Sequence, residues 1–312
     1  MIEIDAITKR YDETTVVDAV SMTIEPHRVT VIAGTSGSGK TTLLRMINRL
    51  VEPTSGSIRI DGEDNHAIPD FELRRRIGYV IQGHGLFPHR TVAQNIATVP
   101  GLLGWKQARI EAKVEELLHL FQLDPAMFSG RFPHELSGGQ QQRVGVARAL
   151  AAEPNILLMD EPFGALDPII RSKAQADLLA IQKLLGTTIV LVTHDMDEAF
   201  GLADSIAVMD GGMLVQHGPP LDLVTRPTSD FVRTMIGASE RPFRLLSIQS
   251  VAQALEPGAA EGEALPETAS QREALARMLW TGCAALPVAA GDGRILGRVT
   301  REGLLRQAAG PR

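Results

Sequence analysis

Residues 34–41 constrain this chain more than any other part of its sequence. They read Gly-Thr-Ser-Gly-Ser-Gly-Lys-Thr and match the pattern Gly-x-x-x-x-Gly-Lys-[Ser/Thr], which forms a phosphate-binding loop between a strand and a helix. The flanking residues supply that context. β-branched residues fill 29–32, and apolar residues recur at helical spacing across 43–50. The sequence therefore predicts a nucleotide-phosphate site at a strand-to-helix turn.

Each residue type in this loop suits a phosphate. Glycines let backbone N–H groups point inward at the β- and γ-phosphates of a nucleotide, and the helix N-terminus adds a partial positive charge. Lys40 adds a full charge, and the Thr41 hydroxyl can ligate Mg²⁺. The predicted ATP-binding residues of the loop are Gly34, Thr35, Ser36, Gly37, Ser38, Gly39, Lys40, Thr41 and Thr42.

Two adjacent carboxylates follow an apolar run at residues 156–159, which read Ile-Leu-Leu-Met. A phosphate loop needs a second group for the metal and a base for the attacking water. Because adjacent residues on a strand point opposite ways, Asp160 is expected on the Mg²⁺ side with Thr41, and Glu161 is expected to reach the water. The alternative is a solvated acidic strand end.

The order of elements predicts an α/β fold with two parts. The runs 156–159 and 188–193 suit parallel strands buried on both faces, and residues 110–121 have the apolar spacing of an amphipathic helix. After residue 236 the composition changes, and residues 256–267 are rich in Ala, Gly and Pro with only acidic charges. We therefore expect a nucleotide-binding domain at 1–236, a linker at 237–242 and a smaller domain at 243–312.

Composition indicates which partners and which cellular compartment suit the chain. Its 312 residues contain 31 Lys plus Arg and 37 Asp plus Glu, a net charge of −6, which argues against nucleic acid as a partner. A single cysteine, Cys283, and the acids Glu3 and Asp5 near the start predict a reducing, cytoplasmic compartment. The apolar runs are much shorter than the roughly 20 residues of a spanning helix, so a membrane role would need a partner.

Residues 136–143, Leu-Ser-Gly-Gly-Gln-Gln-Gln-Arg, resemble the signature sequence of ATP-binding-cassette (ABC) ATPases. The resemblance covers roughly residues 1–236 and implies a P-loop NTPase of the ABC type, with a mixed β core and a helical subdomain. Phe163-Gly164 replaces the family's common Phe-Ser, a departure that leaves Asp167 in register. The other family motifs occur in order at Tyr11, the phosphate loop, Gln82, the signature, Asp160-Glu161, residues 164–167 and His194.

The resemblance implies roles for residues that the loop chemistry alone does not identify. Tyr11 would stack on the adenine ring, Gln82 would bind Mg²⁺ or the water, and His194 would hydrogen-bond the γ-phosphate. Taken singly, each of these three also fits an ordinary structural role, and it is their joint order that favours a site. The candidate catalytic residues are thus Glu161, His194 and Gln82, and the candidate metal ligands are Thr41, Gln82 and Asp160.

The resemblance also implies a homodimer of head-to-tail subunits. The signature residues Ser137, Gly138, Gly139 and Gln140 would contact ATP held by the other subunit, and Asp167 would link the two sites. ATP binding would close the pair and hydrolysis would open it.

Residues 82–96 resemble the segment of importer ATPases that contacts a short cytoplasmic helix of a transmembrane permease. Its apolar residues Leu86, Phe87 and Pro88 would form a docking patch, and the alternative is that they cover the protein's own core. Residues 46–50, 72–79 and 160–167 resemble importers of quaternary ammonium osmoprotectants such as glycine betaine, choline and carnitine.

That family implies a place for the chain and further partners. The chain would lie on the cytoplasmic face of the inner membrane, peripheral through the permease, and would act indirectly with a periplasmic or lipid-anchored substrate-binding protein. The alternatives are another small solute, such as a polyamine, an amino acid or a metal, and a non-transport ABC ATPase.

The last 70 residues or so resemble one repeat of the cystathionine-β-synthase (CBS) type, with the order helix, strand, turn, strand, helix over residues 274–305. The tail is long enough for only one repeat, so pairing would involve the second subunit. Nucleotide-binding repeats usually carry a carboxylate three positions after a Thr. After Thr300 that position is Gly303, which argues against an adenosine ligand in this tail.

Overall fold

The computed structural model describes residues 1–83 and 85–309, and the chain divides into two units, Met1–His217 and Gly218–Arg312. This division comes earlier in the chain than the expected linker at 237–242. Helices α10 (Pro220–Thr225) and α11 (Asp230–Ile236) group with the C-terminal unit, because α10 packs against α12 (Arg241–Ile248). The two units are described separately below.

The first unit begins with a four-stranded antiparallel sheet in the order β2-β1-β4-β5. The register of β1 shifts at several points along β2, and β1 ends at Tyr11, which pairs with Thr14. The inward side chains of β1, including Ile2, Ile4 and Ile7, are buried in the main core of the unit. The strands are β1 (Ile2–Tyr11), β2 (Thr14–Ile24), β4 (Ser55–Ile60) and β5 (Glu63–Asp64).

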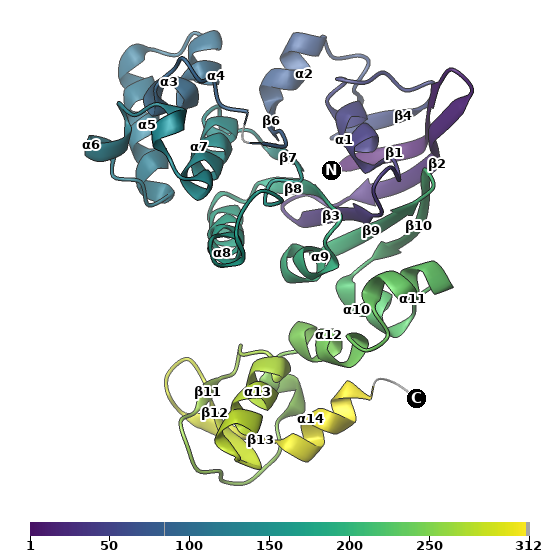
Figure 1. Cartoon of the computed structure of the whole chain (residues 1–312), viewed down its shortest axis with the longest axis vertical. Coiled ribbons are helices and arrows are strands. Elements are labelled where there is room, and N and C mark those ends of the chain that lie inside the picture. Colours follow the sequence, from purple (N-terminus) through teal and green to yellow (C-terminus); the bar gives the residue numbers. More distant parts are fainter. Residues whose placement is uncertain (84, 310–312) are drawn as a thin grey trace. The chain divides into compact units, whose positions relative to one another are not determined.

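A six-stranded sheet in the order β10-β9-β3-β8-β7-β6 positions the site (Figure 1). Strand β3 is parallel to β8 and β9, and β7 is parallel to β8 and β6. Every residue of β3, β7 and β8 is buried, so the predicted parallel strands with two covered faces are confirmed. The strands are β3 (Val29–Gly34), β6 (Ile77–Val80), β7 (Ile156–Asp160), β8 (Thr188–Thr193), β9 (Ser205–Asp210) and β10 (Met213–Gly218).

The carboxyl ends of the parallel strands meet at one edge of this sheet. Ala33 is in register with Thr193, and Asp160 is in register with Val192. Helix α1 (Lys40–Ile47) starts at this edge and packs against β3, β7 and β8. It ends before Leu50, the last residue of the predicted apolar pattern. Helix α2 (Asp70–Arg76) packs against β6, and α9 (Met196–Leu202) packs against β3 and β8. Helix α8 (Pro168–Leu185) packs against α7 (Gly138–Leu150).

A group of helices lies to one side of the two sheets (Figure 1). The helix predicted over residues 110–121 is α5, which buries Ile110, Val114, Leu117 and Leu118. Together with the sheets, this group confirms the predicted α/β class with a helical subdomain. Its members are α3 (Val92–Ile96), α4 (Thr98–Leu102), α5 (Gln107–Leu120), α6 (Pro125–Phe128), the 3₁₀ turn η1 (Pro133–Glu135) and α7 (Gly138–Leu150).

The second unit is built on a three-stranded sheet in the order β11-β12-β13. Its core contains Leu246, Val251, Met278, Val288 and Leu304. From residue 271 the elements follow the order helix, strand, turn, strand, helix that the sequence predicts. They are α13 (Gln271–Thr281), β12 (Ala285–Ala289), β13 (Ile295–Thr300) and α14 (Arg301–Ala308), preceded by η2 (Val251–Ala254) and β11 (Leu265–Pro266).

The space beside Gly303 is filled by a carboxylate from another part of the second unit. Thr300 Oγ1 donates a hydrogen bond to Glu256 Oε1 at 3.0 Å, and a Cβ added to Gly303 would lie 2.6 Å from the same oxygen. The carboxylate of Glu256 thus lies beside Gly303, the position three residues after Thr300.

Candidate active site

The phosphate loop joins β3 to α1 and is closed by its own lysine. Lys40 Nζ donates to Gly34 O at 2.9 Å, to Thr35 O at 2.6 Å and to Ser38 Oγ at 3.3 Å. Burial lowers the pKa of Lys40, and the nearby carboxylates of Glu161 and Asp160 act in the opposite direction. The ammonium group is therefore held over the loop where a phosphate would be cradled.

Gly39 shows why this loop needs glycine. It caps α1 with φ of 91°, and a Cβ there would lie 2.4 Å from Val16 O. The backbone of β2 thus approaches the start of α1 so closely that no side chain fits. The phosphate loop therefore packs directly against the backbone of β2, which pairs with β1 near Tyr11.

Thr41 and Asp160 form a pair of hard oxygen donors at the start of α1 and the end of β7. Thr41 Oγ1 donates to Asp160 Oδ1 at 2.8 Å, and Arg45 Nη2 lies 3.4 Å from Asp160 Oδ2. Such a pair fits Mg²⁺, which typically takes one or two protein oxygens together with substrate phosphates. Over residues 1–83 and 85–309 the structure contains no cluster of three or more His, Cys, Asp or Glu side chains that would hold a metal without the nucleotide.

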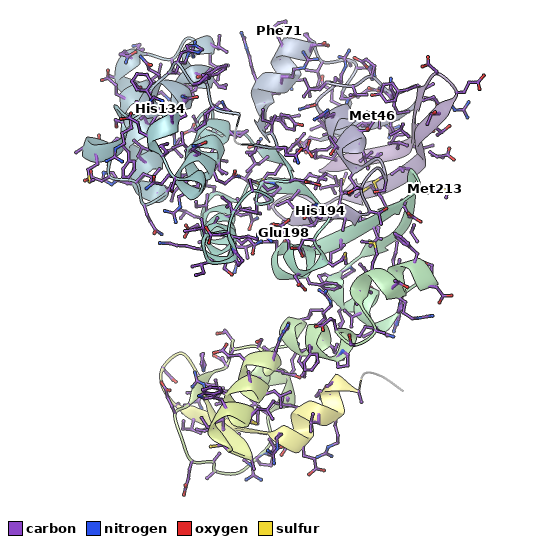
Figure 2. All side chains as sticks on the ribbon, in the orientation of Figure 1. Met46, Phe71, His134, His194, Glu198 and Met213 are labelled. Carbon is purple, nitrogen blue, oxygen red and sulfur yellow. The ribbon has the colours of Figure 1, made fainter. Side chains whose placement is uncertain are left out.

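Glu161 is held between two other strand ends. Gln82 Nε2, after β6, donates to Glu161 Oε2 at 3.2 Å, and His194 Nδ1, after β8, lies 3.1 Å from Glu161 Oε1. Figure 2 labels His194 at this edge of the sheet. The structure thus brings the three candidate catalytic residues into one cluster beside the Thr41–Asp160 pair.

Asp160 and Glu161 reach different partners, but the cause is more specific than strand alternation. Strand β7 ends at Asp160, and Glu161 has a left-handed backbone with φ of 44°. Its amide donates to Val192 O at 3.0 Å, which fixes the turn against β8. The left-handed residue directs one carboxylate to Thr41 and the next to Gln82 and His194.

The signature residues lie at the start of α7, in the helical group rather than at the phosphate loop (Figure 1). Ser137 Oγ accepts from Gln140 N at 3.4 Å, and Gln140 Oε1 accepts from Ser137 N at 2.9 Å, a capping box. Gly138 is exposed. In the described part of the chain, no hydrogen bond joins these residues to Lys40 or Glu161.

The remaining predicted residues lie at exposed positions. Tyr11 is 47% exposed, with Lys9 Nζ 4.8 Å from its ring centroid. Asp167 is exposed and caps α8 by accepting from the backbone amides of Ile169 and Ile170 at 3.2 and 3.1 Å.

The loop that carries the predicted docking residues is exposed, but hydrogen bonds from other parts of the chain hold its backbone in place. Phe87 and Pro88 are exposed and Leu86 is half-buried, so the core-covering alternative does not describe Phe87 and Pro88. The buried Asn95 hydrogen-bonds the backbone of this loop, and Arg148 Nη1 donates to Gly85 O at 2.7 Å. The sequence does not single out either residue: Asn95 lies within residues 82–96 but carries no local mark of its contact, and Arg148 lies 63 residues away from Gly85.

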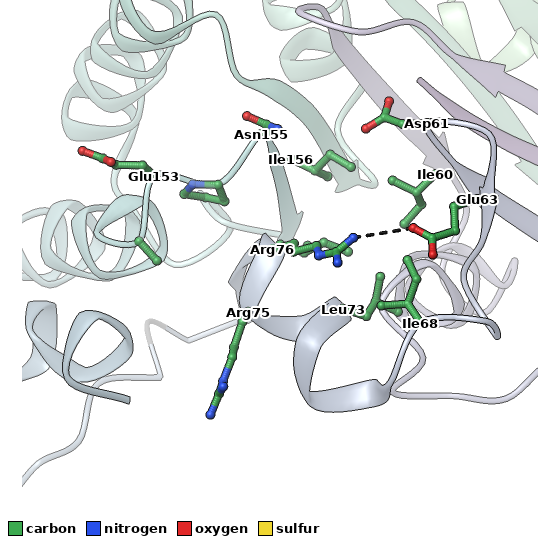
Figure 3. Close-up of a pocket in the computed structure, with 13 residues that line it drawn as sticks. Ile60, Asp61, Glu63, Ile68, Leu73, Arg75, Arg76, Glu153, Asn155 and Ile156 are labelled. Carbon is green, nitrogen blue, oxygen red and sulfur yellow. Dashed lines mark ion pairs between the residues drawn. The ribbon is translucent and has the colours of Figure 1, made fainter. Parts of the chain in front are cut away.

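A cavity of about 360 Å³ lies at the other end of β6 and β7, where Ile77 and Ile156 begin these strands (Figure 3). An ion pair between Arg76 and Glu63 at 3.6 Å crosses it. None of the predicted site residues lines this cavity.

Comparison with known proteins identifies the family. Residues 17–164 match the family described as ABC transporter. The dimeric structure of MJ0796, a bacterial ABC transporter cassette, superposes with a TM-score of 0.63 at 33% identity, over 70% of this chain and 98% of that one. The chain belongs to the ABC transporter family and is an ATPase subunit of that type.

The curated relatives narrow the family further. The glycine betaine uptake system ATP-binding protein YehX of Escherichia coli K12 is 51% identical over 309 residues, 99% of this chain and 100% of that protein. The glycine betaine/carnitine/choline transport ATP-binding protein OpuCA of Bacillus subtilis is 49% identical over 238 residues, 76% of this chain and 62% of that protein. The chain is thus homologous to ATP-binding subunits of osmoprotectant importers.

Proposed function

We propose that this chain is the ATP-hydrolysing subunit of a membrane importer for quaternary ammonium osmoprotectants such as glycine betaine, choline or carnitine. The substrate class is supported by the names of the relatives, one of which matches this chain over its whole length. The observation that carries the chemistry is the carboxylate of Glu161, held by Gln82 and His194 beside the pair Thr41 and Asp160.

Glu161 is the residue that we assign to the attacking water. Its two oxygens have separate partners, at 3.2 Å in Gln82 and 3.1 Å in His194, so the orientation of the carboxylate is fixed from two sides. A carboxylate held in this way can orient a water for in-line attack on the γ-phosphate and accept its proton. Mg²⁺, bound with ATP by Thr41, Asp160 and Gln82, would neutralise phosphate charge.

Two copies of the chain are proposed to complete each other's sites. The N-terminus of α7 offers a partial positive charge and backbone amides at Gly138 and Gly139, away from the chain's own phosphate loop. In a head-to-tail dimer these amides would contact the γ-phosphate of ATP on the other copy, with Asp167 between the two sites. The related cassette structure is dimeric, which supports the pairing of two copies.

The docking partner is proposed to be a cytoplasmic helix of a transmembrane permease, which would hold the chain at the cytoplasmic face of the inner membrane. Besides the exposed Phe87 and Pro88, the helical group has a groove of about 350 Å³ with an apolar floor that includes Ile110 and Val114. Helix α3 lines this groove with Ala93 and also carries Asn95, which fixes the docking loop. The described residues include no helix long and apolar enough to cross a membrane.

The C-terminal residues 243–312 are proposed to form a single CBS-like repeat, which pairs with that of the second subunit. The order of α13, β12, β13 and α14 supports this assignment. A periplasmic or lipid-anchored substrate-binding protein would deliver the solute to the permease and act on this chain only indirectly.

The variant Glu161→Gln tests the chemistry. It keeps the size of the side chain but replaces one acceptor oxygen by an NH₂ group and removes the base. ATP binding should persist, the closed dimer should accumulate on a sizing column, and turnover should fall by about 100-fold or more. Glu25→Gln, at an exposed position, is the matched control. Turnover at the wild-type level in Glu161→Gln would refute the role of Glu161.

Reconstitution tests the transport assignment. The chain is combined with its permease in liposomes and supplied with the substrate-binding protein of the same system. ATP-dependent uptake of labelled glycine betaine, choline or carnitine is expected. Uptake of spermidine with none of these three would overturn the substrate class, and ATPase stimulation by DNA or ribosomes in place of the permease would overturn the transport role.

A further inference from the structure

Arg171 connects two loops that carry predicted site residues. It lies in the first turn of α8, directly after the loop that ends at Asp167. Its Nη2 donates to Leu166 O at 3.1 Å, and its Nη1 lies 3.4 Å from Asp195 Oδ2. Since Asp195 follows His194 in the chain, one guanidinium group joins the Asp167 loop to the neighbour of His194.

Asp195 is itself held rigidly. Its Oδ1 accepts the backbone amides of Asp197 at 2.8 Å and Glu198 at 3.3 Å and so caps α9, and its own amide donates to Thr193 Oγ1 at 3.0 Å. The other oxygen, Oδ2, faces Arg171. A displacement of Arg171 therefore acts on the turn between β8 and α9 as a whole.

A second contact between the same helices lies about one turn further along α8. Gln175 Nε2 donates to Glu198 Oε1 at 3.0 Å, and Glu198 is only 6% exposed. Figure 2 labels Glu198 near His194, at the start of α9. This second bond anchors α8 on α9, so that Arg171 remains in reach of Asp195.

We propose that Arg171 is a positioning residue for ATP hydrolysis, which sets the position of His194 against Glu161 according to the position of the Asp167 loop. The proposal rests on the ATPase function. A planar guanidinium can bond a carbonyl and a carboxylate in two directions at once, which the single ammonium of lysine does less well. In a dimer, contacts made by Asp167 would reach the catalytic cluster by this route.

The solvent exposure of the Arg171–Asp195 ion pair distinguishes a positioning role of Arg171 from a role in fold stability. The side chains of Arg171 and Asp195 are 32% and 35% exposed, and an ion pair of this kind contributes little to stability. Removal of Arg171 should therefore alter the geometry at His194 much more than the unfolding temperature.

The kinetic test compares Arg171→Gln with Lys173→Gln, which removes an exposed cation from the same helix. Arg171→Gln should lower kcat by about tenfold, with KM for ATP within about twofold of wild type. Arg171→Lys should recover part of the loss, and Lys173→Gln should match wild type. Equal effects of the two glutamine variants, or a loss that appears only in KM, would overturn the proposal.

A double-substitution cycle tests whether Arg171 acts through Asp195. Asp195→Asn keeps an acceptor at the helix cap but removes the charge that faces Arg171. If the two residues act as one unit, the double variant Arg171→Gln/Asp195→Asn should be no slower than Arg171→Gln alone. Fully additive losses in kcat would overturn the proposal.

A spectroscopic readout tests the positioning without turnover. In protein with ¹³Cε1-labelled histidine, the His194 signal is assigned by its loss in His194→Ala. Arg171→Gln and Asp195→Asn should shift this signal, and Lys173→Gln should leave it in place. An unmoved signal in Arg171→Gln would overturn the proposal even if kcat fell. If the wild-type chain did not hydrolyse ATP, the ATPase function would fail while this measurement still reported on the contact.

Discussion

Replacement of Asn95 by alanine is expected to loosen the loop at Leu86, Phe87 and Pro88, which we propose as the contact site for the permease. Asn95, in α3, is fully buried, and its amide makes four hydrogen bonds with that loop and the residues after it. Oδ1 accepts from Phe87 N at 2.8 Å, and Nδ2 donates to the carbonyl oxygens of Phe87, Arg90 and Thr91 at 3.2, 3.1 and 3.0 Å. The side chain of Asn95 thus fixes the backbone at Phe87, between Leu86 and Pro88.

The cost of Asn95→Ala depends on which backbone groups keep a partner. Phe87 O also accepts from Arg90 N at 3.1 Å, and Thr91 O accepts from Asn95 N at 2.8 Å, so both remain bonded. Among hydrogen bonds between residues that the structure describes, Phe87 N and Arg90 O have only the Asn95 amide. A buried group without a partner costs about 1–3 kcal/mol, so two cost about 2–6 kcal/mol in a rigid loop.

The solvent exposure of the loop decides how much of this free-energy cost Asn95→Ala would show. Phe87 is 39% exposed, so the loop can open and let water satisfy the two groups. We therefore expect a loss near the lower end, about 2 kcal/mol in the free energy of unfolding, together with a disordered docking patch. Urea unfolding of the purified chain measures the first effect. Stimulation of ATPase activity by the permease measures the second, and basal ATP binding should not change.

Asn95→Asp is the matched variant because it keeps the shape and the acceptor for Phe87 N. It replaces the amide NH₂ by a carboxylate oxygen that faces three carbonyl oxygens, so it should destabilise at least as much as Asn95→Ala. A milder effect of Asn95→Asp would show that the amide is oriented the other way. Full stimulation by the permease in both variants would refute the link between this loop and docking.

Two further predictions concern the first unit. Gly39→Ala should destabilise the chain and abolish ATP binding, because its Cβ would lie 2.4 Å from Val16 O at a φ of 91°. Gly37→Ala, with φ of 80° but no atom within 4 Å of its Cβ, should show only the backbone strain of roughly 1–2 kcal/mol. Equal urea midpoints would contradict this reasoning. Burial lowers the pKa of His217 below its usual 6.5, and His217 Nε2 lies 2.9 Å from Ser205 Oγ. Since protonation then favours the unfolded chain, stability should be lost as the pH falls through 6.5 and below, less so in His217→Gln, which keeps a partner for Ser205. Urea midpoints between about pH 5 and pH 8 test this, and parallel pH curves for both proteins would count against it.

The parts of the fold that the sequence predicts well are those set by local chemistry and burial. Apolar runs predict β7 and β8, and both strands are buried throughout, because a strand covered on two faces has no polar positions to interrupt its pattern. The phosphate loop is predictable because close backbone approach and positive φ at Gly34 and Gly39 leave glycine as the residue that fits. The amphipathic helix followed from a single buried stripe.

The parts that sequence reasoning missed depend on contacts between residues far apart in the chain. The carboxylate of Glu256 lies beside Thr300 and Gly303, although Glu256 is 44 residues away from Thr300 in the chain. Arg171 gains its position only when α8 packs beside the turn after His194. The division of the chain after His217 likewise follows from the packing of α10 on α12, which no change in composition near residue 217 marks.

The backbone conformation of Glu161 indicates which step of ATP hydrolysis a second copy of the chain would control. A left-handed conformation is unfavourable for a residue with a side chain, by roughly 1–2 kcal/mol, and persists only where its surroundings hold it. Here the amide of Glu161 is bonded to Val192 O, and its carboxylate is held by Gln82 and His194, all within one chain. The carboxylate that we propose as the base is therefore already oriented in a single subunit, whereas the signature at Ser137 lies apart from it. In the proposed dimer, hydrolysis would await the partner's contact with the γ-phosphate rather than the orientation of the base.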